Sequence, residues 1–239
     1  MKGIVFKGDR KLELQTFDDP TPGPGEVVLE IKASGMCGSD LKFYRSPQGE
    51  AMRALGFREG KTVIAGHEPC GVVVAVGANV NPKQARVGQR VMVHHYKGCG
   101  VCPHCSTGWQ QLCVEGVAEV YGVTGNGAHA AYMKCPANTI VGLPDELSFE
   151  TGAAIACGTG TAWGALQRLE LKGDQTIAIF GQGPVGLSPT QLAIAPLARV
   201  IAPDVTAPRL TRPHVPAATD TLTPTSTTPF RPTRPCPPG

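Results

Sequence analysis

One stretch of the chain, residues 66–77, has the sequence GHEPCGVVVAVG, in which an apolar run of valines and an alanine lies between glycines. Such a run bounded by glycine is typical of a buried β-strand. Similar short runs rich in Val and Ile surround it, among them EVVLEIKASG at residues 26–35 and RVMVHH at residues 90–95. Strand signals at this close spacing predict a small β-barrel or sandwich over residues 1–147.

A second pattern begins at Ser148. Residues 148–169 carry small and apolar side chains at helical spacing, and residues 173–186, GDQTIAIFGQGPVG, join a short apolar strand to a glycine loop. We therefore predict a partial α/β domain over residues 148–210. Residues 211–239 are rich in Thr and Pro and lack apolar periodicity, so we expect a disordered tail there.

Composition limits the classes of protein that the chain can represent. Its 239 residues carry a formal net charge of +3 with scattered lysines and arginines, which argues against nucleic acid or an anionic membrane as a partner. The N-terminus lacks the apolar stretch of a secretory signal, and no apolar run approaches the ~20 residues that span a bilayer. We expect a cytoplasmic protein acting on a small molecule, whose nine cysteines favour metal binding or chemistry over disulfides.

Four cysteines lie together in CGVCPHCSTGWQQLC at residues 99–113. Their spacing lets a compact loop surround one ion with the thiolates of Cys99, Cys102, Cys105 and Cys113. Soft thiolates complete the tetrahedral shell of Zn²⁺, so we predict a closed structural zinc site. Free or redox-active thiols on a loop are one alternative, and an iron–sulfur cluster is another.

Three more residues of the metal-ligand type lie far apart in the sequence: Cys37 in GMCGSD, His67 in GHEPCG and Cys157 in AIACGTGTAW. Spacing alone does not bring them together. The chain carries these motifs, the four-cysteine loop and GQGPVG in the order found in zinc-containing alcohol dehydrogenases. It resembles that medium-chain dehydrogenase family over about its first 186 residues and, more faintly, to about residue 210. The resemblance implies an α/β plus β fold, with an N-terminal chaperonin-10-like (GroES-like) β-barrel catalytic domain followed by an incomplete Rossmann domain.

The resemblance assigns the three separated residues to a catalytic zinc ion, with the fourth position left for water or substrate. Asp40 would accept the second N–H of His67 and fix the tautomer of its ring. Glu68 approaches the metal in relatives; a buried carboxylate in a local network is the alternative. Ser39 would begin a proton relay from the substrate, and Lys42 stands where many relatives continue the relay with a histidine. Two zinc ions per chain are therefore expected.

The resemblance also implies hydride transfer between a nicotinamide cofactor and a small alcohol or polyol, or the corresponding carbonyl compound. The cofactor phosphates would lie over the glycine loop, Asp204 would accept the ribose hydroxyls, and Thr161 would pack on the nicotinamide. A carboxylate at that position favours NAD over NADP, although Arg209 leaves NADP open. His95 would line the substrate pocket and make it more polar, with a half-buried strand residue as the alternative. The residues expected to contact the cofactor are Thr161, Gly181, Gly183, Val185, Gly186, Asp204 and Arg209.

Two prolines conflict with the implied fold. Pro189 lies inside the helix that should follow the glycine loop, where a proline removes an N–H and costs ~3 kcal/mol. Pro203 should interrupt the second parallel strand just before Asp204. Relatives form homodimers or homotetramers, and we expect the oligomerising part to be missing from this chain. Two hypotheses follow: an NAD(P)-linked zinc alcohol dehydrogenase, or a zinc-binding remnant that transfers no hydride.

Overall fold

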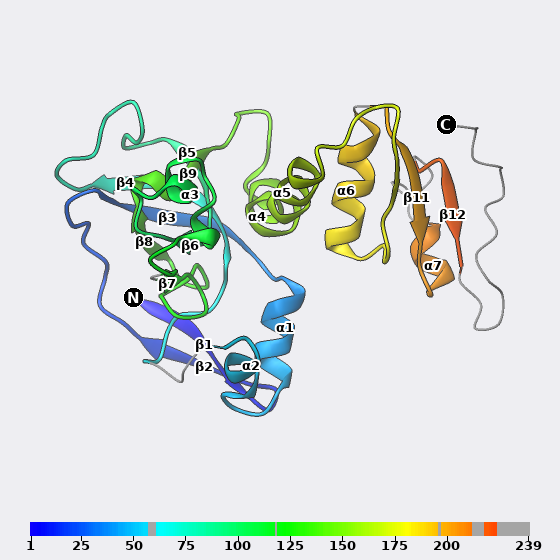
Figure 1. The fold of residues 1–239 in the computed structure, drawn as a ribbon. Helices are drawn as coiled ribbons and strands as arrows, with labels where there is room; N and C mark the ends of the chain where they lie inside the picture. The colour runs from blue at the N-terminus through cyan, green and yellow to red at the C-terminus, as the bar shows by residue number, and fades with distance from the viewer. Residues whose placement is uncertain (57–60, 118, 196, 212–217, 224–239) are drawn as a thin grey trace. The chain divides into compact units, whose positions relative to one another are not determined.

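In the computed structural model the chain forms two compact units, Met1–Cys157 and Gly158–Gly239, called unit 1 and unit 2 below (Figure 1). The structure describes residues 1–56, 61–117, 119–195, 197–211 and 218–223. Each unit has its own sheet and its own apolar core. Within the described ranges, no helix is long and apolar enough to cross a membrane.

The centre of unit 1 is a five-stranded antiparallel sheet with the strand order β8-β3-β4-β5-β9. The strand predicted within residues 66–77 is β4, which begins at Glu68 and pairs with β3 on one side and β5 on the other. Val27, Leu29 and Val73 are fully buried in the core between these strands and their neighbours. The five strands are β3 (Glu26–Gly35), β4 (Glu68–Val76), β5 (Arg90–Val93), β8 (Tyr132–Pro136) and β9 (Ile140–Gly142). The predicted β-rich N-terminal domain is therefore confirmed.

Shorter elements complete unit 1. β1 (Lys2–Gly8) pairs with β2 (Lys11–Thr16), and β6 (Tyr96–Lys97) pairs with β7 (Glu119–Val120), both antiparallel. The four-cysteine loop lies between β6 and β7. The helices are α1 (Gly38–Arg45), α2 (Glu50–Ala54), α3 (Pro103–Ser106) and α4 (Phe149–Ala154), and 3₁₀ turns span Gln110–Leu112 and Ala137–Thr139.

The boundary between the units falls after Cys157, ten residues beyond the boundary expected after Leu147. The reason is the packing of α4, which contacts β3, β4 and β5 of the unit 1 sheet. Ala153 and Phe149 of this helix join an apolar cluster with Cys70 of β4. Helical spacing in the sequence predicts that a helix forms, but it does not say which sheet the helix covers.

Unit 2 contains a three-stranded parallel sheet with the order β10-β11-β12. Its core includes Leu166 of α5, Ala193 of α6 and Val200 of β11, which are all buried. This is the parallel α/β arrangement predicted for the second domain. The elements are α5 (Gly160–Leu169), β10 (Thr176–Ala178), α6 (Pro184–Ile194), β11 (Arg199–Pro203), α7 (Ala207–Leu210) and β12 (Asp220–Leu222).

The prediction that proline would interrupt α6 and β11 is wrong. Helix α6 continues through Pro189 to Ile194, because the next residues, Thr190 and Ala193, are fully buried and hold the helix against the core. Pro203 is the last residue of β11, so the strand needs no donor beyond it, and its carbonyl accepts the N–H of Gly181 at 2.8 Å. Tertiary packing therefore outweighs the local preference of Pro189, whereas Pro203 lies at a strand end, where proline is tolerated.

Part of the stretch expected as a disordered tail forms β12 instead. The guanidinium of Arg199 donates to the carboxylate of Asp220 at 2.8 Å, and the N–H of Val200 donates to the hydroxyl of Thr219 at 3.2 Å. These two contacts hold β12 against β11 beside the backbone ladder between the two strands. The expected tail begins at residue 211, and only residues 211 and 218–223 of it are described. The other residues of the tail, 212–217 and 224–239, lie outside the described residues.

Candidate metal and cofactor sites

The first candidate site is assembled where β3 leads into α1 and where β4 begins. Cys37 caps the N-terminus of α1, and its backbone N–H donates to Oδ2 of Asp40 at 2.9 Å. Nδ1 of His67 donates a hydrogen bond to Oδ1 of Asp40 at 3.0 Å, and both side chains are buried. Gly35 faces Glu68 across β3 and β4, and a side chain at Gly35 would collide with the Glu68 carboxylate. These contacts bring Cys37 beside the start of β4.

Cys157 reaches the same place from 120 residues further along the chain. It lies in a five-residue π-helix, Ile155–Thr159, which is a rare conformation found frequently at functional sites. Its Sγ is 3.9 Å from Sγ of Cys37. The ligand atoms of Cys37, His67, Glu68 and Cys157 all lie within 4.8 Å of one another, and we call these four residues the Cys37 cluster.

The charges of the Cys37 cluster perturb each other strongly. Hydrogen bonds from Cys157 and His67 lower the pKa of Cys37 to about 3. The hydrogen bond that Cys157 donates to Cys37, together with burial, raises the pKa of Cys157. Burial lowers the pKa of His67, but the hydrogen bonds to Asp40 and Cys37 outweigh it and raise that pKa to about 10. Burial and the negative charge on Cys37 raise the pKa of Glu68 to about 7.

This donor set fits a zinc ion. Three acidic groups share a small space, and burial together with the negative charge on Cys37 raises the pKa of both Glu68 and Cys157. A divalent cation opposes that effect, because it stabilises every thiolate and carboxylate that it binds. Thiolate sulfur, imidazole nitrogen and carboxylate oxygen are the ligands that Zn²⁺ uses in proteins.

Three further expected residues lie near this cluster in the chain or in space. Ser39 is exposed on the first turn of α1, with its Oγ 3.9 Å from Sγ of Cys37, and Lys42 is exposed one turn later. His95 is 6% exposed, so it is buried rather than half-buried. Its ring lies 5.1 Å from the ring of His67, and its Nδ1 has no hydrogen-bond partner in the described part of the chain. Burial lowers the pKa of His95 to about 3, so the ring is neutral.

The second cluster is the four-cysteine loop. The Sγ atoms of Cys99, Cys102, Cys105 and Cys113 lie within 4.8 Å of one another, and none of the four forms a disulfide. Backbone N–H groups of the loop point at the sulfurs: the N–H of Cys99 donates to Cys113, that of Cys102 to Cys99 and that of Cys105 to Cys102, at 3.3 to 3.5 Å. Such bonds favour thiolates. The loop therefore fits a tetrahedral structural zinc, as its spacing predicted.

The glycine loop of unit 2 joins β10 to α6, and its three glycines serve different purposes. Gly181 has φ of +87°, a left-handed conformation that side chains disfavour. A side chain at Gly186 would collide with the carbonyl of Gly181, so this glycine allows the close approach of helix and loop. A methyl group at Gly183, the N-cap of α6, would meet no protein atom within 4 Å. The loop is therefore constrained at both ends and open in the middle, where a phosphate would need to approach the backbone.

Asp204 follows β11 and is tied to the glycine loop. Its Oδ2 accepts the N–H of Gln182 at 2.6 Å and its Oδ1 accepts the N–H of Thr206 at 2.7 Å. The bond from Gln182 is the main cause that lowers the pKa of Asp204. Each carboxylate oxygen keeps a second lone pair for a ribose hydroxyl. Arg209 lies 3.6 Å from Oδ2 of Asp204, while Thr161 on α5 and Val185 on α6 are exposed.

Two glutamines that support these sites were not anticipated from the sequence. Gln182, fully buried, donates from Nε2 to the carbonyl of Ile179 at 2.9 Å and accepts the hydroxyl of Thr190 at 3.0 Å, which ties the glycine loop to α6. Gln110, also buried, accepts the N–H of Gly98 at 2.9 Å and so anchors the four-cysteine loop. Glutamine is mostly exposed in proteins, and no local pattern marks these two as buried.

Two metal-ligand clusters in a β-rich first unit, followed by a glycine loop on a parallel sheet, are the features of the medium-chain, zinc-type alcohol dehydrogenase family. Residues 23–145 match the family model described as the alcohol dehydrogenase GroES-like domain. The chain belongs to the zinc-type alcohol dehydrogenase family, as the sequence motifs predicted.

Individual relatives agree with this assignment. An uncharacterized zinc-type alcohol dehydrogenase-like protein of Escherichia coli strain K12 is 36% identical over 81% of this chain and 54% of its own length. The sorbitol dehydrogenase of Bacillus subtilis strain 168 is 35% identical over 78% of this chain and 50% of its own length. The solved structure of acetophenone reductase from Geotrichum candidum in complex with NAD has a TM-score of 0.79 at 30% identity, covering 95% of this chain and 64% of that one. The chain thus spans about half to two thirds of the length of these relatives.

Proposed function

We propose that the chain acts as a zinc-dependent, NAD-linked oxidoreductase that interconverts a small alcohol or polyol with its carbonyl compound. The observation that carries this proposal is the Cys37 cluster with Asp40 behind His67, because it combines a zinc donor set with the carboxylate that orients a ligand histidine. The sorbitol dehydrogenase relative supports a polyol as one substrate class.

The residues of unit 1 have separable tasks in this proposal. Cys37, His67 and Cys157 hold the metal, which when bound polarises the substrate oxygen as a Lewis acid. Asp40 accepts the Nδ1 proton of His67 and so leaves Nε2 free as the ligand atom. Glu68 supplies a nearby carboxylate, and burial and the negative charge on Cys37 raise its pKa to about 7, which supports this placement.

Two more side chains handle the substrate. Ser39, exposed beside Cys37, accepts the proton of the substrate hydroxyl and passes its own hydroxyl proton to water, and Lys42 lies exposed at the next turn of α1. His95 presents an unpartnered, neutral ring nitrogen next to His67, so it favours a substrate with a second hydroxyl that can use this nitrogen.

The residues of unit 2 hold the cofactor, which accepts or returns the hydride. The open middle of the glycine loop at Gly183, with Val185 and Gly186 on the first turn of α6, takes the phosphates. Asp204 accepts the ribose hydroxyls and disfavours a 2′-phosphate, which supports NAD over NADP, while Arg209 lies along its edge. Thr161 contacts the nicotinamide.

A zinc count and an NADH titration test this proposal on the purified chain. We expect two zinc ions per chain and NADH binding in the micromolar range by fluorescence. Gly183→Ala is the matched variant: the added methyl meets no protein atom, so the fold is unchanged, but it occupies phosphate space and should weaken NADH binding at least tenfold.

The second candidate function is a zinc-binding protein that transfers no hydride. It is favoured by Pro189 inside α6, which removes one backbone hydrogen bond from the helix behind the glycine loop. Two zinc ions without NADH binding, or NADH binding that Gly183→Ala leaves unchanged, would support this candidate and overturn the cofactor site proposed above. Fewer than two zinc ions would contradict both candidates.

A further inference from the structure

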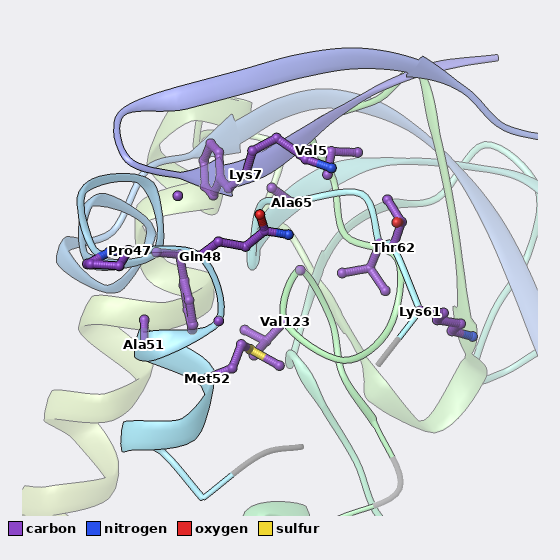
Figure 2. A pocket seen from close by; sticks show the side chains of 16 residues that line it. Val5, Lys7, Pro47, Gln48, Ala51, Met52, Lys61, Thr62, Ala65 and Val123 are labelled. Carbon is purple, nitrogen blue, oxygen red and sulfur yellow. The ribbon is translucent and has the colours of Figure 1, made fainter. Parts of the chain in front are cut away.

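A pocket in unit 1 is built from residues other than those of the two metal clusters. It has a volume of about 210 Å³ and lies between the end of β1, the segment around α2, residues 61–65 and the turn at Gly122 and Val123 (Figure 2). No residue of the Cys37 cluster or the four-cysteine loop is among its described lining residues. The volume is below the ~300–1,000 Å³ of drug-sized sites, which favours a small occupant.

The polar part of the pocket is positively charged. Lys7 and Lys61 are the charged side chains among its described lining residues. Within the described segments the Lys7 ammonium has one ion-pair contact, 3.9 Å to the half-exposed carboxylate of Glu13, which is too long and too exposed to neutralise it. Figure 2 shows the amide of Gln48 extending into the pocket beneath Lys7, with Thr62 on the facing wall, whereas Lys61 points away from them. One ammonium, one amide and one hydroxyl therefore belong to the lining of this pocket.

The rest of the wall is apolar. Val5, Met52, Val63 and Val123 line the pocket around the polar groups. In the view of Figure 2, Met52 and Val123 both lie below the Gln48 amide. A ligand that satisfies both parts needs a single anionic group for Lys7 and a short hydrocarbon for the apolar wall.

We propose that this pocket binds a short aliphatic carboxylate. The carboxylate accepts hydrogen bonds from the Lys7 ammonium and the Gln48 amide, and the hydrocarbon packs against Met52 and Val123. A free phosphate fits less well, because it presents three anionic oxygens to one directed ammonium and leaves the apolar wall without a partner. The site is independent of zinc and of the cofactor, since its described lining residues belong to neither.

Butyrate is the probe that tests the proposal, with butyramide as its neutral isostere and inorganic phosphate as the competing anion. Titrations by calorimetry on the zinc-loaded full chain should show saturable butyrate binding at least tenfold tighter than binding of butyramide or phosphate. Because a carboxylate can also bind a zinc ion, the titration is repeated with Cys37→Ser, which disrupts the Cys37 cluster. Butyrate binding should persist in that variant even if the proposed dehydrogenase function fails.

Two lysine variants complete the test. Lys7→Met should weaken butyrate binding about tenfold or more, because it keeps the length of the side chain and removes the charge. Lys11→Met is the matched control, since Lys11 is exposed on the neighbouring strand β2 and does not line the pocket. Equal affinity of Lys7→Met and the native chain, equal binding of butyramide, tighter binding of phosphate, or loss of butyrate binding in Cys37→Ser would each overturn the proposal. Retained circular dichroism shows that each variant is folded.

Discussion

Replacing Pro189 should stabilise unit 2, because the structure keeps this proline in the middle of a continuous helix. Pro189 has no N–H to donate to the carbonyl of Val185, one turn earlier in α6, and its ring crowds the preceding turn. Proline in a helix interior costs ~3 kcal/mol relative to alanine, and a restored backbone hydrogen bond contributes ~1 kcal/mol of this. We therefore expect Pro189→Ala to raise the opening free energy of α6 by about 1–3 kcal/mol.

Hydrogen exchange measured by mass spectrometry reports this change locally. At ~1.4 kcal/mol for each factor of ten, the amides of α6 should exchange about 5 to 150 times more slowly in Pro189→Ala than in the native chain. Pro184→Ala is the control, because Pro184 occupies the first turn of the same helix, where proline is tolerated. Amides of α6 that exchange no more slowly in Pro189→Ala than in Pro184→Ala would show that Pro189 does not weaken the helix. If the amides of α6 in the native chain exchanged as fast as those of an unfolded peptide, the helix would not be formed and the prediction would also fail.

Three further predictions concern the metal and cofactor sites. Gly186→Ala should lower the free energy of unfolding of unit 2 by about 2 kcal/mol or more in urea titrations, because the methyl collides with the Gly181 carbonyl; an unchanged midpoint would contradict the close approach. Cys102→Ser should remove one zinc ion per chain and lower the melting temperature of unit 1, and retention of both ions with unchanged melting would exclude the structural zinc. Asp40→Asn should weaken the more weakly held zinc about 10–100-fold in chelator competition, and equal affinity would mean that Asp40 does not orient His67.

Much of the fold was predictable wherever the signal is local. The apolar run after His67 forms β4, the four cysteines form one cluster, and the glycine loop has the turn and the close approach that its glycines suggested. In each case the residues that carry the signal lie in one short segment, at most 14 positions apart. Such signals depend little on the rest of the molecule.

The prolines show where local reasoning is insufficient. A proline lowers helix propensity by an amount that the sequence reveals, but the burial of Thr190 and Ala193 that opposes it depends on strands and helices elsewhere in unit 2. The same holds for Gln182, whose burial beneath the glycine loop satisfies three hydrogen-bonding groups and has no signature in the sequence.

By itself the sequence determined the four-cysteine loop, the glycine loop and the strand-rich character of the first 147 residues, because these rest on contacts close along the chain. Only the tertiary structure decided that Cys37, His67 and Cys157 lie within ligand distance, that α4 belongs to unit 1, and that α6 forms despite Pro189. The physical reason is chain separation. The free energy of a contact between Cys37 and a residue 120 positions away is set by the packing of the elements that carry both, and no spacing rule along the chain contains that information.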